Sequence, residues 1–259
     1  NPANLLIYCS QIPPLVQWVP RFGLPSIVAI TVTYVVLKWT QRTALVEPLD
    51  SAVRVPPLSL AGRAAGWGIA IAALVLTGAS ALGWQLGLPT CVAGVLTLAG
   101  VATIKRSSPW PFLREISWGV IPLVAGLFVL VAGLEQSGVI QTLVGSLRAG
   151  VRATPTLTAA GAGLLVGFVS NLVNNLPAGL IAGTAVQAAH VPAIVASATL
   201  IGVDLGPNLS VTGSLATILW LTALRREKVA IKGLDFLKLG LLVMPPALML
   251  SLGVLLLWG

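Results

Sequence analysis

Two polar segments interrupt otherwise apolar sequence in the C-terminal half of the chain. They read SNLVNNLPAG over residues 170–179 and VDLGPNLSVTG over residues 203–213. Asn, Ser, Gly and Pro stand here where a lipid-facing helix carries Leu and Val. Unpaired backbone groups at membrane depth are tolerated only where they are buried in protein or line a cavity. Pairs of such interruptions mark the substrate site of many secondary transporters, so we interpret both segments as helix breaks at a binding site.

Asp204 is the acidic residue whose position most clearly indicates a function. The chain has seven acidic residues, and the other six fall in expected loops or at the ends of expected spans. A carboxylate inside a membrane costs about 2.5–3.5 kcal/mol on insertion scales, which favours a position facing a cavity. We predict that Asp204 is a proton carrier. The alternative is that Asp204, which precedes Gly-Pro by one residue, caps the second half of a broken helix; the two roles are compatible.

Neutral hydrogen-bonding side chains accompany this carboxylate. They offer donors and acceptors without a fixed cation, which suits a neutral hydroxylated solute or a cation. Their alternative role is to satisfy unwound backbone and to join helices. The candidate substrate-binding residues are Ser170, Asn171, Asn174, Asn175, Asn208, Ser210 and Thr212, with Ser214 beyond them. The single histidine, His190, is expected at a helix end, in an interfacial role rather than in a proton relay.

The composition is that of a polytopic helical membrane protein. Of 259 residues, 56% are apolar and 8% are charged, whereas about a quarter are charged in a soluble domain. The formal charge of +8 comes from Lys and Arg in loops between spans, so no nucleic-acid partner is expected. Cys9 and Cys91 lie far apart without metal-ligand spacing. They support neither a disulfide framework nor a metal site, and no cofactor is expected.

The apolar stretches predict an all-α fold. We expect a truncated span at the N-terminus, an amphipathic interfacial helix over residues 135–153 and a tight turn at Trp84-Gln85. Two half-length helices around the Asn cluster predict a re-entrant hairpin over 154–190, and 192–224 reads as one discontinuous helix interrupted at 204–210. Full spans are expected over 22–39, 66–83, 88–104, 116–134 and 239–258.

The distribution of basic residues predicts the sidedness of these spans. Alternating spans place twelve of the fifteen basic residues on one side and leave Arg21, Arg148 and Arg152 on the other. By the positive-inside rule the more basic side is cytoplasmic. We therefore expect a multi-pass protein whose C-terminus emerges on the outer side.

The C-terminal segments resemble the arsenical pump membrane protein (ArsB) family of the ion-transporter superfamily. The resemblance is carried by SNLVNNLPAGLIAGTAVQAAHVP, LIGVDLGPNLSVTGSLATILWLTALRRE and VMPPALML. It implies two inverted repeats, each with a re-entrant hairpin and a broken helix. Residues 1–40 would end the first repeat, 41–65 would be a cytoplasmic linker, and 66–259 would form the second repeat.

The first residues also match this family. Asn1-Pro2-Ala3-Asn4 resembles the SNPxN element on the broken helix of the first repeat, which Gly206-Pro207-Asn208 matches in the second. The resemblance implies that Asn1 and Asn4 bind substrate. It also implies that the chain lacks most of the first repeat, including its hairpin.

The resemblance implies extrusion of arsenite or antimonite across the bacterial inner (plasma) membrane in exchange for protons. Tight capture of As(III) takes three thiolates, and the chain has two distant cysteines, so we expect hydrogen bonding to the neutral hydroxide. One alternative is a related transporter of sodium, a dicarboxylate or another small anion. Another is a membrane subunit driven by a separate ATPase of the ArsA type, since no GxxxxGK[ST] motif occurs. The last is a purely structural bundle.

Overall fold

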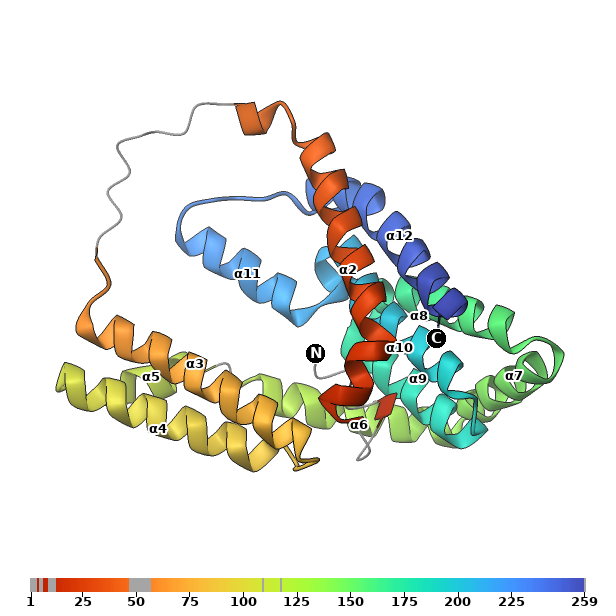
Figure 1. The fold of residues 1–259 in the computed structure, drawn as a ribbon, viewed down its shortest axis with the longest axis horizontal. Helices are drawn as coiled ribbons and strands as arrows, with labels where there is room; N and C mark the ends of the chain where they lie inside the picture. Colours follow the sequence, from red (N-terminus) through yellow and green to blue (C-terminus); the bar gives the residue numbers. More distant parts are fainter. Residues whose placement is uncertain are drawn as a thin grey trace. The chain divides into compact units, whose positions relative to one another are not determined.

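The computed structural model describes residues 4, 7–8, 13–46, 57–108, 110–116 and 118–258. These residues form helices and connecting turns, with no β-strand among them (Figure 1). The helices are α2 Leu15–Thr40, α3 Leu60–Ala81, α4 Gly87–Lys105, α5 Trp110–Glu115, α6 Val120–Gln136, α7 Val139–Ala153, α8 Pro155–Val173, α9 Asn175–Ala189, α10 Ala193–Leu205, α11 Leu215–Arg226 and α12 Gly233–Trp258. Short 3-10 turns are η1 Ala44–Val46, η2 Gly206–Leu209 and η3 Val211–Gly213.

Five helices in the described ranges are long and apolar enough to cross a membrane, namely α2, α3, α4, α8 and α12. Helix α6 has 17 residues, and α10 with η2 forms a shorter apolar segment. The all-α polytopic architecture predicted from the sequence is therefore confirmed. Helix α8 has 19 residues, more than the half-length leg expected, because the helix begins at Pro155 and continues to Val173. The re-entrant arrangement of 154–190 stays a prediction.

Three spans begin at least six residues before their predicted starts, and one of them is α3, which begins at Leu60. Helix α2 begins at Leu15 and continues through Pro20 and Pro25, and α12 begins at Gly233. Prolines inside membrane helices are tolerated where neighbouring groups re-satisfy the backbone. The Oγ of Ser251 in α12 donates a hydrogen bond to the carbonyl oxygen of Pro25 at 3.1 Å. This bond joins α12 to α2 at the level of that proline.

The chain divides into two compact units, and the division passes within α2 and α6. In its described part, one unit holds residues 4, 7–8, 20–46 and 125–258, and the other holds 13–19 and 57–124 without 109 and 117. The smaller unit contains the antiparallel pair α3 and α4. Their turn passes through Trp84-Gln85 as predicted, and the N–H of Trp84 donates to the carbonyl of Ala79 at 2.8 Å.

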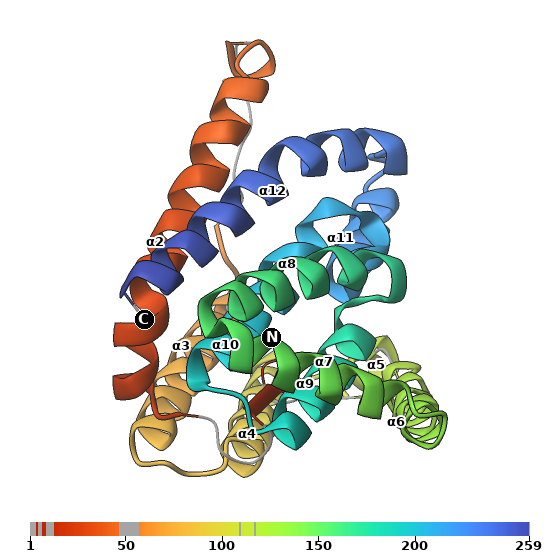
Figure 2. The same ribbon diagram turned by 90° about the vertical axis from the view of Figure 1, so that its right-hand side faces the viewer.

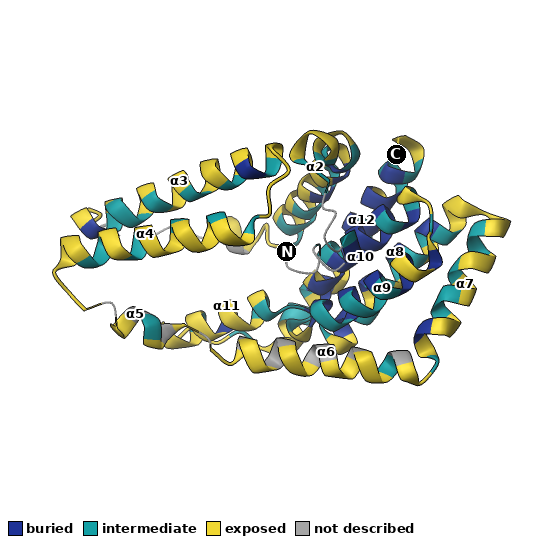
Figure 3. Cartoon of the chain, turned by 90° about the horizontal axis from the view of Figure 1, so that it is seen from below, coloured by how far each residue is buried: buried dark blue, intermediate teal, exposed yellow. Residues whose placement is uncertain are grey.

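The core of the larger unit lies where α8, α10 and α12 meet. Burial concentrates on these helices (Figure 3), and α12 runs across α8 and α10 (Figure 2). Glycines allow α8 and α10 to approach closely. A Cβ on Gly163 would lie 2.7 Å from the carbonyl oxygen of Ala198, and one on Gly202 would collide with the carbonyl of Gly163. Such contacts between small residues are how membrane helices gain dispersion energy without a hydrophobic driving force.

Helix α7 is amphipathic, as the sequence predicted. Ile140 is buried on its apolar face, and Arg148 lies on its polar side. The Nη2 of Arg148 donates to the carbonyl oxygen of Ala188 at 2.7 Å. That carbonyl belongs to the last turn of α9, where the partial negative charge of the helix end stabilises a nearby cation. Arg148 thus fastens α7 to α9, and the placement of α7 in the membrane interface stays a prediction.

The close approach of α8 and α10 predicts a position-specific effect of adding one methyl group. Gly202→Ala should lower the free energy of unfolding by about 1–3 kcal/mol, because the Cβ meets backbone that cannot rotate away. Gly161→Ala on α8 is the matched control, since nothing lies within 4 Å of a Cβ there. Titration of the purified protein with denaturing detergent would measure both; equal losses would contradict the packing described.

Candidate functional site

The first helix break is a single residue. Helix α8 ends at Val173, Asn174 has φ 76°, and α9 begins at Asn175. The ψ of Asn174 is 153°, so this residue has a positive-φ conformation that residues other than glycine rarely adopt. The Oδ1 of Asn174 accepts a hydrogen bond from the N–H of Leu176 at 3.3 Å and so caps α9. The polar tip predicted at the Asn cluster is therefore a sharp corner between two helices.

The second helix break spans nine residues. Helix α10 ends at Leu205, two 3-10 turns follow, and α11 begins at Leu215. The interruption therefore covers 206–214, and the prediction of 204–210 was wrong at both ends. The Oγ of Ser214 caps α11 by accepting from the N–H of Ala216 at 3.2 Å. The predicted capping role of Asp204 is thus contradicted, because Ser214 performs it and Asp204 lies in the last turn of α10.

The side chain of Asn171 joins the two breaks. Its Nδ2 donates to the carbonyl oxygens of Gly167 and Gly206, each at 2.9 Å. Its Oδ1 accepts from the backbone N–H of Ser210 at 3.1 Å and from the Oγ of Ser210 at 3.0 Å. An Asn amide offers two donors and two acceptor sites. All four are used, so Asn171 has no capacity left for a cargo in this conformation.

Neighbouring side chains strengthen the same junction. The Oγ1 of Thr212 donates to the carbonyl of Asn171 at 2.9 Å, and the Nδ2 of Asn174 donates to the carbonyl of Thr212 at 3.0 Å. Ser170 is fully buried and donates to the carbonyl of Gly167 at 2.8 Å. The structure therefore brings five predicted site residues together, and much of their hydrogen bonding satisfies unwound backbone.

Asp204 and Asn208 lie on another side of the second break. Gly202 and Gly206 face α8, since a Cβ on either would collide with an α8 carbonyl. Successive residues of an α-helix turn by about 100°, so Asp204, two residues from each glycine, faces away from α8. Asp204 is half-buried, and Asn208, four residues on, is exposed. Together with Thr212, which is also exposed, these side chains form the accessible polar part of the break.

The remaining predicted residues have different surroundings. Asn175 is 6% exposed in the first turn of α9. The Oδ1 of Asn4 is buried and has no hydrogen-bond partner in the part of the chain that the structure describes. Asn1 lies outside the described residues. His190 ends α9 with φ 52° and is exposed, at the helix end expected from the sequence.

One set of contacts was missed at the sequence level. The Nε2 of Gln187 donates to the carbonyl oxygen of Ile7 at 2.8 Å, and the hydroxyls of Tyr8 and Ser197 lie 3.4 Å apart. These bonds attach the first described residues to α9 and α10. The signal in the sequence was Gln187, the one polar side chain in the last turn of α9.

The described residues contain no group of three or more His, Cys, Asp or Glu side chains that could hold a metal ion. The site is thus built from amides, hydroxyls, backbone carbonyls and one carboxylate. Such groups can exchange hydrogen bonds and a proton with a bound solute.

Comparison with known proteins identifies relatives over most of the chain. The profile of the arsenical pump membrane protein family matches residues 61–259. An arsenical pump membrane protein of Yersinia enterocolitica is 30% identical over 226 residues, which cover 83% of this chain and 51% of the relative. That of Escherichia coli K12 is 30% identical over 244 residues, covering 89% and 56%. An uncharacterized transporter of Mycobacterium tuberculosis is 28% identical over 184 residues, covering 66% and 41%.

The chain spans about half the length of these two arsenical pump relatives. No solved structure matches the chain. The family match includes both helix breaks and every described residue of the candidate site except Asn4.

The role of Asn171 at the junction can be tested by its removal. Asn171→Ala should lower the free energy of unfolding by at least about 2 kcal/mol, because the carbonyl of Gly206 and the N–H of Ser210 lose this partner. Asn208→Ala is the matched control and should change stability by less than about 0.5 kcal/mol, since its side chain is exposed. Detergent-induced unfolding followed by circular dichroism would compare them. A loss for Asn171→Ala no larger than that for the control would refute the junction.

Proposed function

The chain belongs to the arsenical pump membrane protein family, and we propose that it forms part of a secondary exporter of trivalent metalloid. The cargo is arsenite or antimonite as the neutral hydroxide, and the exchanged species is the proton. The names of the relatives point to arsenicals, and five potential spanning helices identify a multi-pass bacterial membrane protein. One observation supports proton coupling above the others: Asp204 lies at a helix break within apolar sequence.

The cargo is proposed from the chemistry of the break. A neutral trihydroxide presents three O–H donors and their oxygen acceptors, which Asn and Thr side chains match. Asn208 and Thr212 are exposed, so we assign them, with Asn174, to hydrogen bonding with the cargo. Asn171, Ser170 and Ser210 hold the breaks in register and position the others. Asn175 stays with the positioning group because it is buried. Asn1 and Asn4 are proposed to complete the site from the first repeat.

Proton exchange is proposed for Asp204. Because the cargo is uncharged, its export draws no energy from the membrane potential, so a titrating group must couple it to the proton gradient. Asp204 takes a proton from the outside and releases it to the cytoplasm, and cargo moves in the opposite direction.

The fold proposed around this site is that of the ion-transporter superfamily. Residues 66–259 are the second inverted repeat, with α8 and α9 as its re-entrant hairpin and α10 and α11 as its broken helix. Residues 1–40 end the first repeat, and the linker proposed for 41–65 lies partly outside the described residues. The inner (plasma) membrane is the proposed location, with the loops before α3, after α4 and before α12 on the cytoplasmic side.

Replacing the carboxylate tests proton coupling. In everted vesicles that hold the full-length protein, Asp204→Asn should reduce arsenite uptake driven by a proton gradient at least about ten-fold, because the amide cannot carry a proton. Asp235→Asn is the control; Asp235 is exposed in the first turn of α12, 4.0 Å from the Nζ of Lys238. Undiminished exchange by Asp204→Asn would refute Asp204 as the carrier.

The same vesicles separate the alternative activities. Uptake by the unaltered protein that needs ATP and an added ATPase, and ignores the proton gradient, would replace the exchanger with a pump subunit. If excess sodium or a dicarboxylate inhibited arsenite uptake and antimonite did not, the competing solute would be the cargo in place of the metalloid. If the vesicles took up no solute under any of these conditions, the result would support a purely structural helix bundle.

If the cargo is bound by hydrogen bonds and not by thiolates, transport should tolerate the loss of both cysteines. Cys91 is exposed on α4, and Cys9 lies outside the described residues. The double variant Cys9→Ser, Cys91→Ser should retain uptake within about two-fold, because no thiolate contacts the cargo. A loss of ten-fold or more in the initial rate of arsenite uptake would contradict the proposed mode of binding.

A further inference from the structure

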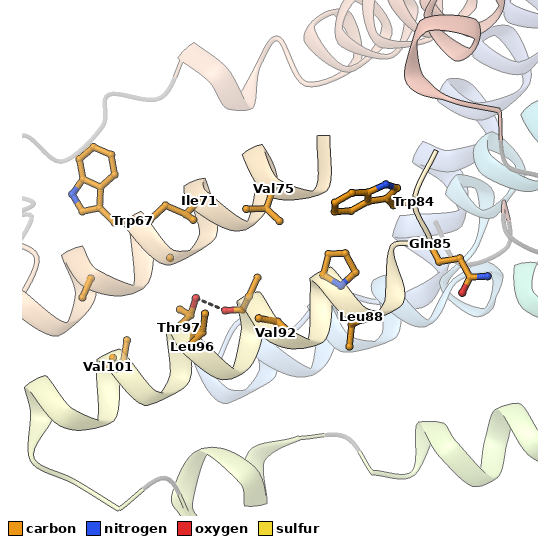
Figure 4. Close-up of a pocket in the computed structure, with 15 residues that line it drawn as sticks. Trp67, Ile71, Val75, Trp84, Gln85, Leu88, Val92, Leu96, Thr97 and Val101 are labelled. Atoms are coloured by element: carbon orange, nitrogen blue, oxygen red, sulfur yellow. Dashed lines mark hydrogen bonds between the residues drawn. The ribbon is translucent and has the colours of Figure 1, made fainter. Parts of the chain in front are cut away.

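An apolar groove of about 850 Å³ lies between α3 and α4, remote in sequence from the helix breaks (Figure 4). Two polar side chains line it, Gln85 and Thr97. The Oγ1 of Thr97 donates to the carbonyl of Ala93 at 2.8 Å, so this hydroxyl is already engaged by its own helix. The volume falls within the range of about 300–1,000 Å³ that is typical of ligand sites.

The groove runs along the axes of α3 and α4. Helix α3 has 22 residues, which corresponds to about 33 Å at 1.5 Å per residue, close to the thickness of the hydrocarbon region. Lining residues extend from Ala64 and Val101 at one end to Trp84 at the other. Both helices are largely exposed (Figure 3). An acyl chain lying in the groove would therefore be parallel to the neighbouring lipids.

One end of the groove is basic and the other carries no charge. Trp67 lines the groove, and Arg63 lies four residues earlier on the same face of α3. Val101 lines it from α4, and Lys105 lies four residues later on the same face. Two cations from two helices therefore lie over the same mouth. The sequence over 57–108 contains no Asp or Glu, and the turn at Trp84-Gln85 has no charged residue.

The helix dipole favours one of these two cations and disfavours the other. Lys105 lies in the last turn of α4, where a cation is favoured by the helix dipole. Arg63 lies in the first turn of α3, after the N-cap Ser59, where the dipole disfavours a cation. An anion between Arg63 and Lys105 would offset that cost. Trp67, one turn deeper, has an indole N–H that suits the headgroup level of a bilayer.

We propose that this groove binds one anionic phospholipid of the cytoplasmic leaflet, with its phosphate between Arg63 and Lys105 and an acyl chain along α3 and α4. Phospholipids supply the two features that the groove pairs, a negatively charged headgroup and a long apolar chain. Basic pockets between membrane helices on the cytoplasmic side recognise such headgroups. The site is independent of the proposed transport mechanism.

Native mass spectrometry of the purified full-length protein would test the charge requirement. With equimolar phosphatidylglycerol and phosphatidylcholine of identical acyl chains, the protein should retain the anionic lipid about ten-fold more than the zwitterionic one. The double variant Arg63→Gln, Lys105→Gln should bring that ratio to about one, because both phosphate partners are lost. Arg225→Gln, Arg226→Gln removes two basic residues at the end of α11 and should leave the ratio unchanged.

A second pair of variants tests the groove without altering charge. Gly100 lines the groove, Gly94 lies on the same helix outside it, and no atom lies within 4 Å of a Cβ on either. Gly100→Leu should fill the groove and lower retention of phosphatidylglycerol at least about three-fold, and Gly94→Leu should not. Equal retention of both lipids by the unaltered protein, or a preference that survives Gly100→Leu, would overturn the proposal. So would a lipid-free dimer that Gly100→Leu dissociates, because a second copy would then occupy the groove.

Discussion

Backbone polar groups inside a membrane need partners from the protein, and this requirement explains the arrangement around the two helix breaks. The second break leaves 206–214 outside regular α-helix. Asn171, from the end of α8, supplies partners for the carbonyl of Gly206 and for the N–H of Ser210. Without such an amide the unwound segment could not stay in hydrocarbon. Two backbone groups of the second break therefore depend on this one side chain for a partner.

Close packing and hydrogen bonding act together at this junction. Gly163, Gly167, Gly202 and Gly206 bring the two helices near enough for a short amide to reach across. Gly240 lets α12 approach η2 equally closely, since a Cβ there would collide with the carbonyl of Leu209. Larger residues at these positions would separate the helices beyond hydrogen-bond distance. The glycines and Asn171 therefore both hold the helices together at this junction, the glycines by close contact and Asn171 by hydrogen bonds.

Much of this architecture could be predicted from the sequence, and the errors have physical causes. Apolar length located the spans, and the polar clusters located the breaks, because both are local properties. The start of α12 was misplaced because polar residues of its first turn resemble a loop. The role of Asn171 could not be predicted, since its partners Gly206 and Ser210 lie 35 and 39 residues away. For the same reason the sequence placed Asn171 and Asp204 in one lining, whereas they lie on different sides of the break.

The junction at Asn171 has a mechanical consequence. Three hydrogen bonds of the Asn171 side chain, the bonds that link Thr212 to Asn171 and Asn174, and the glycine contacts tie the end of α8 and the corner at Asn174 to the second break. Segments tied in this way translate and rotate together, as a rigid body. A transport cycle that parted the two breaks would have to expose several unpaired backbone groups to hydrocarbon. Any displacement that carries a cargo across is therefore expected to occur at the edges of this body, where Arg148 and Ser251 each make a separable contact.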